Sequence, residues 1–258
     1  MKARPLSGSQ CARGAVILLA SLYWEGNEPA QDGEQDKRRK AWRESELDLA
    51  TFRGLPGIPI RYGRRSASRN GEFTIVLGGE PAGLAKIVNL RHSLPVEHGA
   101  LAGKAVATLR RQVKALAEAE GIWSLRNPQP FNSWGLVCIA INPRCKFHGR
   151  LREVWTRHFR PQFTPAEYGP GILDRDGLLQ IPLSAEAWSG LDYCLAAPTK
   201  PNCPVPTPKE IAEAAKWGSY FRRTSESGIT TADDAEIRKY LRNLFLPAAC
   251  SSAAANSR

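Results

Sequence analysis

The sequence predicts an α+β fold, with a small mixed, barrel-like β-sheet, packed helices and a helical C-terminal extension. Three features lead to this prediction. A near-continuous apolar run at 15–22 is typical of a strand buried on both faces. Short runs rich in Ile, Val, Phe and Thr follow it, and an amphipathic segment at 98–119 comes after those. Helix-capping signals then recur from residue 207 onward.

Size and composition are those of a globular protein. The chain has 258 residues, 42% of them apolar, which is enough to bury a sizeable core. No apolar run approaches the roughly 18 residues that a membrane span needs, so we expect no membrane association. The run at 15–22 lacks a small-residue cleavage site after it, and we expect a buried first strand there rather than a secretory signal.

The cysteines predict a reduced, cytoplasmic protein. Six are scattered along the chain without a spacing pattern, which argues against a disulfide framework. Cys138, Cys145, His148 and His158 lie near one another in the sequence. Because they lack the paired Cys-x-x-Cys spacing of a zinc knuckle, we expect no metal site.

Four regions are expected along the chain. They are a disordered leader (1–13), a mixed α/β core domain (14–197), a proline-rich connector with a helical hairpin extension (198–247) and a disordered tail (248–258). In the extension, Thr207-Pro208-Lys209-Glu210 is a capping box with proline at the first helical position. It predicts a helix over 208–224, and a last helix follows through Phe245.

The core domain contains several predicted elements. Strands are expected at 58–62, 72–77, 83–90 and 135–141, with weaker ones at 178–182 and 191–196. Asn70–Gly71 marks the turn of a hairpin between the first two of these. Helices are expected around Trp42, at 98–119 and over the apolar stripe from Leu151 to Phe159.

A pair of glutamates ends the long predicted helix. Glu118 and Glu120 lie near the negative end of the helix macrodipole, where a negative charge is disfavoured. Partial burial there would raise a carboxyl pKa toward the range useful for general acid–base catalysis. A solvated helix end is the alternative interpretation.

The order of these segments resembles the gamma-glutamylcyclotransferase-like family over about residues 15–142. The segments are L-A-S-L at 19–22, an arginine-containing stretch, a hairpin, G-L-A-K-I-V and L-A-E-A-E-G. In that family the first strand ends in Y-G-S-L, whose backbone amides hold the glutamyl carboxylate of the substrate. A glutamate in an L-D-x-x-E-G context is the acid–base.

The resemblance implies roles for five residues. Leu19, Ala20, Ser21 and Leu22 would bind substrate, and Glu120 would be catalytic. Ala20 stands where the family has glycine, and Leu19 where it has tyrosine. The implied activity is cleavage of γ-glutamyl amides by intramolecular cyclisation to 5-oxoproline. It takes a small γ-glutamyl substrate and needs no cofactor or metal.

An alternative is a non-catalytic basic module that binds nucleic acid or a partner protein. The formal net charge is +11, which favours anionic partners. Arg61, Arg64, Arg65 and Arg69 fall in one predicted hairpin, where they could contact phosphates. The basic stretch 144–160 adds aromatic residues suited to base stacking, although some of them also fall on the apolar stripe of a helix.

Overall fold

Five strands form the central sheet of the computed structural model, which describes residues 11–25, 33–80, 82–97, 100–101, 103–160 and 165–245. In spatial order they are β3 (Leu47–Ile58), β6 (Gly83–Leu90), β2 (Gly14–Leu18), β10 (Tyr193–Ala196) and β9 (Cys138–Ile141). β2 runs parallel to β10, and the other neighbours are antiparallel. The fold is α+β, and the described strands do not close into a barrel.

β2 lies at the centre of this sheet, as its apolar sequence predicted. All five residues are buried, and they alternate between the two faces: Val16 and Leu18 pack into one apolar cluster, Ala15 and Ile17 into the other. The expected strand over 15–22 was too long, however. It ends at Leu18, and α1 (Ser21–Trp24) follows. A short apolar run does not distinguish a strand from a buried helical turn.

Two smaller sheets contain the other strands of the described residues. β4 (Ile60–Arg65) and β5 (Phe73–Leu77) form the predicted hairpin, in which Asn70 and Gly71 adopt positive φ angles of 52° and 78°. The other sheet contains β1 (Cys11–Ala12), β7 (Leu94–Glu97) and β8 (Ala100–Leu101). Residues 11–12 therefore belong to a strand, although the sequence analysis placed them in the leader.

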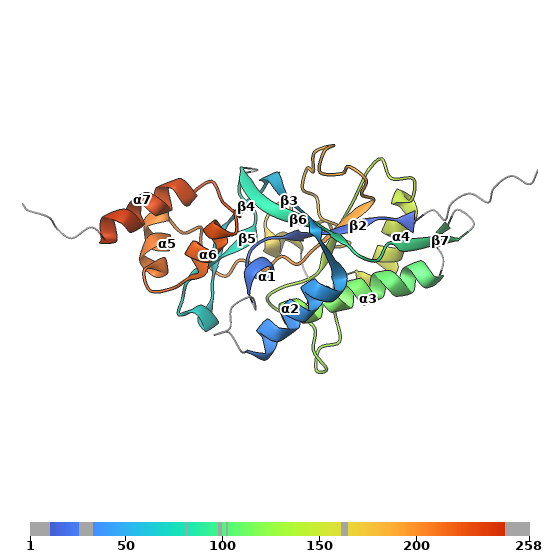
Figure 1. Cartoon of the computed structure of the whole chain (residues 1–258), viewed down its shortest axis with the longest axis horizontal. Helices are drawn as coiled ribbons and strands as arrows, with labels where there is room; N and C mark the ends of the chain where they lie inside the picture. The colour runs from blue at the N-terminus through green and yellow to red at the C-terminus, as the bar shows by residue number, and fades with distance from the viewer. Residues whose placement is uncertain are drawn as a thin grey trace, which may run out of the picture.

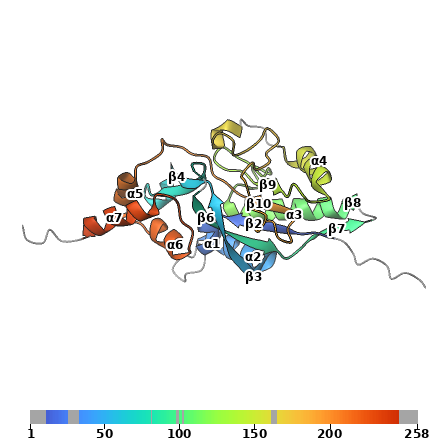
Figure 2. The same cartoon turned by 90° about the horizontal axis from the view of Figure 1, so that it is seen from above.

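Helices cover one face of the central sheet, and the C-terminal helices lie at one end of the molecule beside the β4–β5 hairpin (Figures 1 and 2). One face packs against α2 (Glu34–Glu46), α3 (Gly103–Glu120) and α4 (His148–Phe159). The other packs against the β4–β5 hairpin. Of the C-terminal helices, α5 (Pro208–Ala215) and α6 (Tyr220–Glu226) contact β5, and α7 (Asp234–Phe245) packs against α5. Short 3-10 turns lie at Ala67–Arg69 and Pro165–Tyr168.

The capping box at Thr207 is formed as predicted, but the helix after it is shorter than expected. The Thr207 hydroxyl accepts the Glu210 N–H, and the Glu210 carboxylate accepts the Thr207 N–H. The expected helix over 208–224 is divided into α5 and α6. Between them, Gly218 lies against the carboxyl group of Glu72, which accepts the N–H of Tyr220 at 3.0 Å. This contact from Glu72, the residue before β5, lies at the point where the new helix begins at Tyr220.

Two other strand expectations were wrong in part. β3 begins at Leu47, whereas only residues from 58 onward were expected to be extended, and its register shifts twice against β6. Segment 178–182 is not a strand: Leu178 and Leu179 make only isolated bridges, and Pro182 then removes a backbone donor. The leader up to residue 10 and the tail at 248–258 lie outside the described residues. No helix in the described part of the chain is both long and apolar enough to cross a membrane.

Candidate functional site

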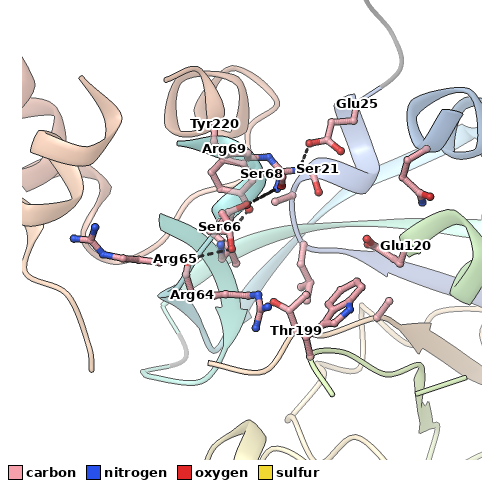
Figure 3. Close-up of a pocket in the computed structure, with 18 of the residues that line it drawn as sticks. Ser21, Glu25, Arg64, Arg65, Ser66, Ser68, Arg69, Glu120, Thr199 and Tyr220 are labelled. Carbon is pink, nitrogen blue, oxygen red and sulfur yellow. Dashed lines mark hydrogen bonds and ion pairs between the residues drawn. The ribbon is translucent and has the colours of Figure 1, made fainter. Parts of the chain in front are cut away.

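A cavity of about 790 Å³ lies where the chain leaves β2. Its size falls within the range of small-molecule sites. The end of β2, α2, the β4–β5 hairpin, the end of α3 and the start of α6 all contribute to its walls (Figure 3). Among the lining residues are Leu19, Ala20, Ser21, Glu25, Arg39, Arg64, Arg65, Arg69, Glu120, Trp134, Thr199 and Tyr220.

Glu120 is the last residue of α3, and its side chain is largely buried in the cavity wall. The helix is fixed by apolar residues on its core face, such as Leu109 and Leu116. Only 13% of the Glu120 side chain is exposed, and one of its carboxylate oxygens lies 3.4 Å from Nη2 of Arg39. Glu118, about 200° around the helix, is 44% exposed and faces Lys114. The structure thus gives the two glutamates different surroundings.

Burial raises the pKa of Glu120 above its ordinary value. The positive charges of Arg39 and Arg69 and the hydrogen bond from Arg39 act in the opposite direction, but they do not cancel the desolvation. A carboxyl group with a raised pKa is a stronger base once it is ionised. It is therefore better suited to exchanging a proton with an amine.

Glu25 links the two arginines that act on Glu120. Its carboxylate pairs with Arg39 of α2 and with Arg69 of the hairpin, and only 7% of its side chain is exposed. Arg43, which is also buried, donates to the carbonyl oxygens of Leu22 (2.8 Å) and Glu25 (2.5 Å). These contacts hold α1 against α2. Since Glu25 neutralises part of the arginine charge, the arginines act less strongly on Glu120.

The turn at Leu19-Ala20-Ser21-Leu22 borders the same cavity as Glu120, which follows about a hundred residues later in the sequence. The first three residues line the cavity, whereas the side chain of Leu22 is buried in the core. The backbone N–H groups of Ser21 and Leu22, at the start of α1, have no acceptor among the residues that the structure describes. The Ser21 amide is thus a free donor at the cavity wall.

The hairpin arginines do not form one open basic face. Arg64, Arg65 and Arg69 line the cavity, and Arg69 is paired with Glu25. Arg61 lies outside the cavity lining and donates to the carbonyl oxygen of Tyr62 in its own strand.

Two aromatic residues of the basic stretch are unavailable for base stacking. Trp155 is fully buried and Phe159 is 8% exposed; their rings pack together at 4.8 Å between centroids. For this pair the core interpretation is correct. The basic charge of the stretch lies on the exposed side of α4.

No group of His, Cys, Asp and Glu side chains suited to holding a metal ion occurs in the described part of the chain. The described cysteines are unpaired thiols. Burial raises the pKa of the Cys145 thiol to about 12 and that of the Cys194 thiol likewise to about 12, so neither is a reactive thiolate at neutral pH.

Sequence reasoning missed several lining residues. Glu25 lies four residues after Ser21, so a helical turn after the strand would have indicated it. Arg39 and Tyr220 carry no such local signal, because tertiary packing of α2 and α6 brings them to the cavity. No protein-family model matches the sequence, and no curated protein matches it.

Stability should vary with pH through Glu120. Its pKa is raised on folding, so its contribution is fully present below the unfolded-state pKa and is lost as the pH rises through the folded-state pKa. Gln cannot ionise, so the variant does not lose this contribution. The difference in free energy of unfolding, Glu120→Gln minus wild type, should therefore be larger at about pH 8 than at about pH 5. Urea denaturation at both pH values measures this difference. An equal difference at both would show that the carboxyl group is not desolvated.

Proposed function

We propose that this protein is a gamma-glutamylcyclotransferase-like enzyme that cleaves γ-glutamyl amides by intramolecular cyclisation, with Glu120 as the general acid–base. One observation supports this above all. The turn at 19–21 and Glu120, which the resemblance pairs as substrate-binding turn and catalytic residue, line the same cavity.

The proposed reaction takes place within the substrate. The free α-amine of the γ-glutamyl group attacks its own γ-carbonyl carbon. A carbon–nitrogen bond forms, and the bond to the leaving amine breaks. Ionised Glu120 accepts a proton from the attacking nitrogen and returns it to the leaving nitrogen, so the products are 5-oxoproline and a free amine. Neither water nor a redox partner is consumed.

The protein's part is to hold the substrate in the reactive geometry, which can supply a large share of the rate enhancement. The open N–H of Ser21 can donate to the substrate carboxylate or to the carbonyl oxygen as charge develops there. Arg39 holds the Glu120 carboxylate in place. Ala20 stands at the family's glycine position. Its methyl group is packed in the wall of the cavity, and only 6% of the residue is exposed.

We also propose that the C-terminal helical extension belongs to this site. Tyr220 of α6 forms part of the cavity wall, and its hydroxyl accepts the N–H of Ile75 from β5 at 3.1 Å. Glu72 anchors the start of the same helix. The extension therefore supports a lining residue that the core domain does not supply.

The test is to incubate the protein with γ-glutamyl-alanine and to measure 5-oxoproline by mass spectrometry. N-acetyl-γ-glutamyl-alanine is the matched control substrate, because its α-amine cannot attack. We expect 5-oxoproline from the first compound and no cleavage of the second. Release of free glutamate, or cleavage of the acetylated compound, would indicate hydrolysis and contradict the mechanism.

Removing the charge of Arg39 should move the pH dependence of this reaction. The Arg39 guanidinium lowers the pKa of Glu120, so Arg39→Gln should raise it and shift the acid limb of the kcat/KM profile to higher pH. Arg38→Gln is the matched control, since Arg38 is exposed on the same helix and pairs with Glu34. An acid limb that stays in place in the Arg39 variant would show that another group controls proton transfer.

A further inference from the structure

Arg64 differs from Arg39 and Arg69, the two cavity arginines that pair with carboxylates, in its charge environment. Arg39 and Arg69 share Glu25, whereas Arg64 makes no ion pair with any residue that the structure describes. Nonetheless, Arg64 is half-buried on the inner side of β4. Even partial loss of hydration is unfavourable for a cation that has no counter-charge. Its position therefore suggests that a bound molecule supplies the negative charge.

The guanidinium of Arg64 is held in place by neutral groups only. Nη1 donates to the carbonyl oxygen of Lys200 at 2.9 Å, and the group lies 5.8 Å from the ring centre of Trp134. Burial lowers the pKa of Arg64, but an arginine remains charged at neutral pH. A guanidinium has five N–H donors, so most of them stay available to an anion.

Thr199 provides a second free polar group at the same place. Its hydroxyl oxygen is buried and has no hydrogen-bond partner in the described part of the chain, and the residue lines the cavity. Figure 3 shows the Thr199 side chain next to the Arg64 guanidinium. Arg65, the neighbour of Arg64, is instead directed away from Glu120 and lies over the ring of Phe73 at 4.5 Å.

We infer that Arg64 and Thr199 form a subsite for an anionic group, a carboxylate or a phosphate, on the part of the substrate that leaves. This inference rests on the proposed function, which places the glutamyl group at Ser21 and Glu120. The subsite lies on a different wall, formed by β4 and the segment after β10. It would favour γ-glutamyl derivatives of amino acids or of phosphorylated amines over those of simple amines.

Three substrates test this preference. γ-Glutamyl-alanine and γ-glutamyl-ethylamide differ only by the carboxylate of the leaving amine, and γ-glutamyl-(1-aminoethyl)phosphonate replaces that carboxylate by a phosphonate. In Arg64→Gln, we expect the kcat/KM ratio of an anionic substrate to the ethylamide to fall about 10- to 100-fold. The larger fall with the alanine or the phosphonate compound identifies the preferred anion. Arg126→Gln, an exposed arginine outside the cavity lining, should leave both ratios unchanged.

Further variants and a binding measurement make the result decisive. Arg64→Lys keeps the charge without the forked donors and should give an intermediate ratio. Thr199→Val should lower the ratio in the same direction. Thermal unfolding shows whether each variant is folded. In addition, calorimetry with Glu120→Gln measures the binding of γ-glutamyl-alanine without turnover.

The outcomes separate the inference from the proposed function. Binding that depends on Arg64, without formation of 5-oxoproline by the wild type, would support the subsite and reject the activity. If the wild type forms 5-oxoproline and the kcat/KM ratios of the anionic substrates to the ethylamide are unchanged in Arg64→Gln, the activity is supported and the subsite is overturned. Absence of both turnover and binding of the anionic compounds by the wild type would also overturn the subsite.

Discussion

Glu120→Gln is expected to reduce the turnover of γ-glutamyl amides by about 10²- to 10⁴-fold. The amide has the same shape as the carboxyl group, but it cannot accept the proton of the attacking amine. The fold should tolerate this nearly isosteric change, because it removes a desolvated charge and Arg39 stays paired with Glu25. The measurement is the rate of 5-oxoproline release at saturating substrate, together with circular dichroism of the variant.

The matched control is Glu118→Gln. Glu118 is on the same helix two residues earlier, but it is exposed and pairs with Lys114. Its substitution should leave turnover at the wild-type level. If both variants lost activity equally, general loss of charge at the helix end would explain the effect better than proton transfer. If neither lost activity, Glu120 would not be the acid–base.

Trp155→Ala is expected to lower the free energy of unfolding by about 3–5 kcal/mol. The side chain is fully buried, its ring packs against Phe159, and its indole N–H donates to the carbonyl oxygen of Asp176 at 3.1 Å. Truncation leaves a large void and an unpaired carbonyl oxygen. Urea denaturation measures the loss, provided that wild type and variant have similar m-values.

Trp217→Ala is the control for this change. Trp217 is 81% exposed and lies beside Lys216, so its removal should change stability by less than about 0.5 kcal/mol. Comparing the two variants shows how much stability depends on a buried tryptophan and how much on an exposed one. A small effect of Trp155→Ala would mean that its helix does not pack as described, and the base-stacking interpretation would have to be considered again.

The sequence predicted correctly those parts of the fold that are determined by residues close together in the chain. Buried β2, the Asn70–Gly71 turn and the capping box at Thr207 each depend on neighbouring residues, and each is present. Long-range contacts determine the rest. The break between α5 and α6 needs Glu72 from another part of the chain. The length of β3 comes from pairing with β6 and not from its own composition.

The candidate site divides in the same way. Glu120 and the turn at 19–21 could be proposed from sequence, because both match motifs of the family that the chain resembles and Glu120 also stands at the end of a predicted helix. That they line one cavity was implied by the resemblance alone, since no local signal shows how α3 packs against the sheet. The surroundings of Arg64 could not be predicted either: its half-burial without an ion pair appears only when Trp134 and Lys200 are placed around it.

The pairing of β2 with β10 has a consequence for protein synthesis. Arg13 and Asp192, which are hydrogen-bonded beside this pair, are 179 residues apart. At about 5–20 residues per second, a ribosome would need roughly 10–35 seconds to make the intervening chain. During that time the β10-facing edge of β2 is unpaired in the nascent chain, although β6 can already cover its other edge. The cavity would be completed later still, once Tyr220 has left the ribosome, so this site forms only after β10 has been made.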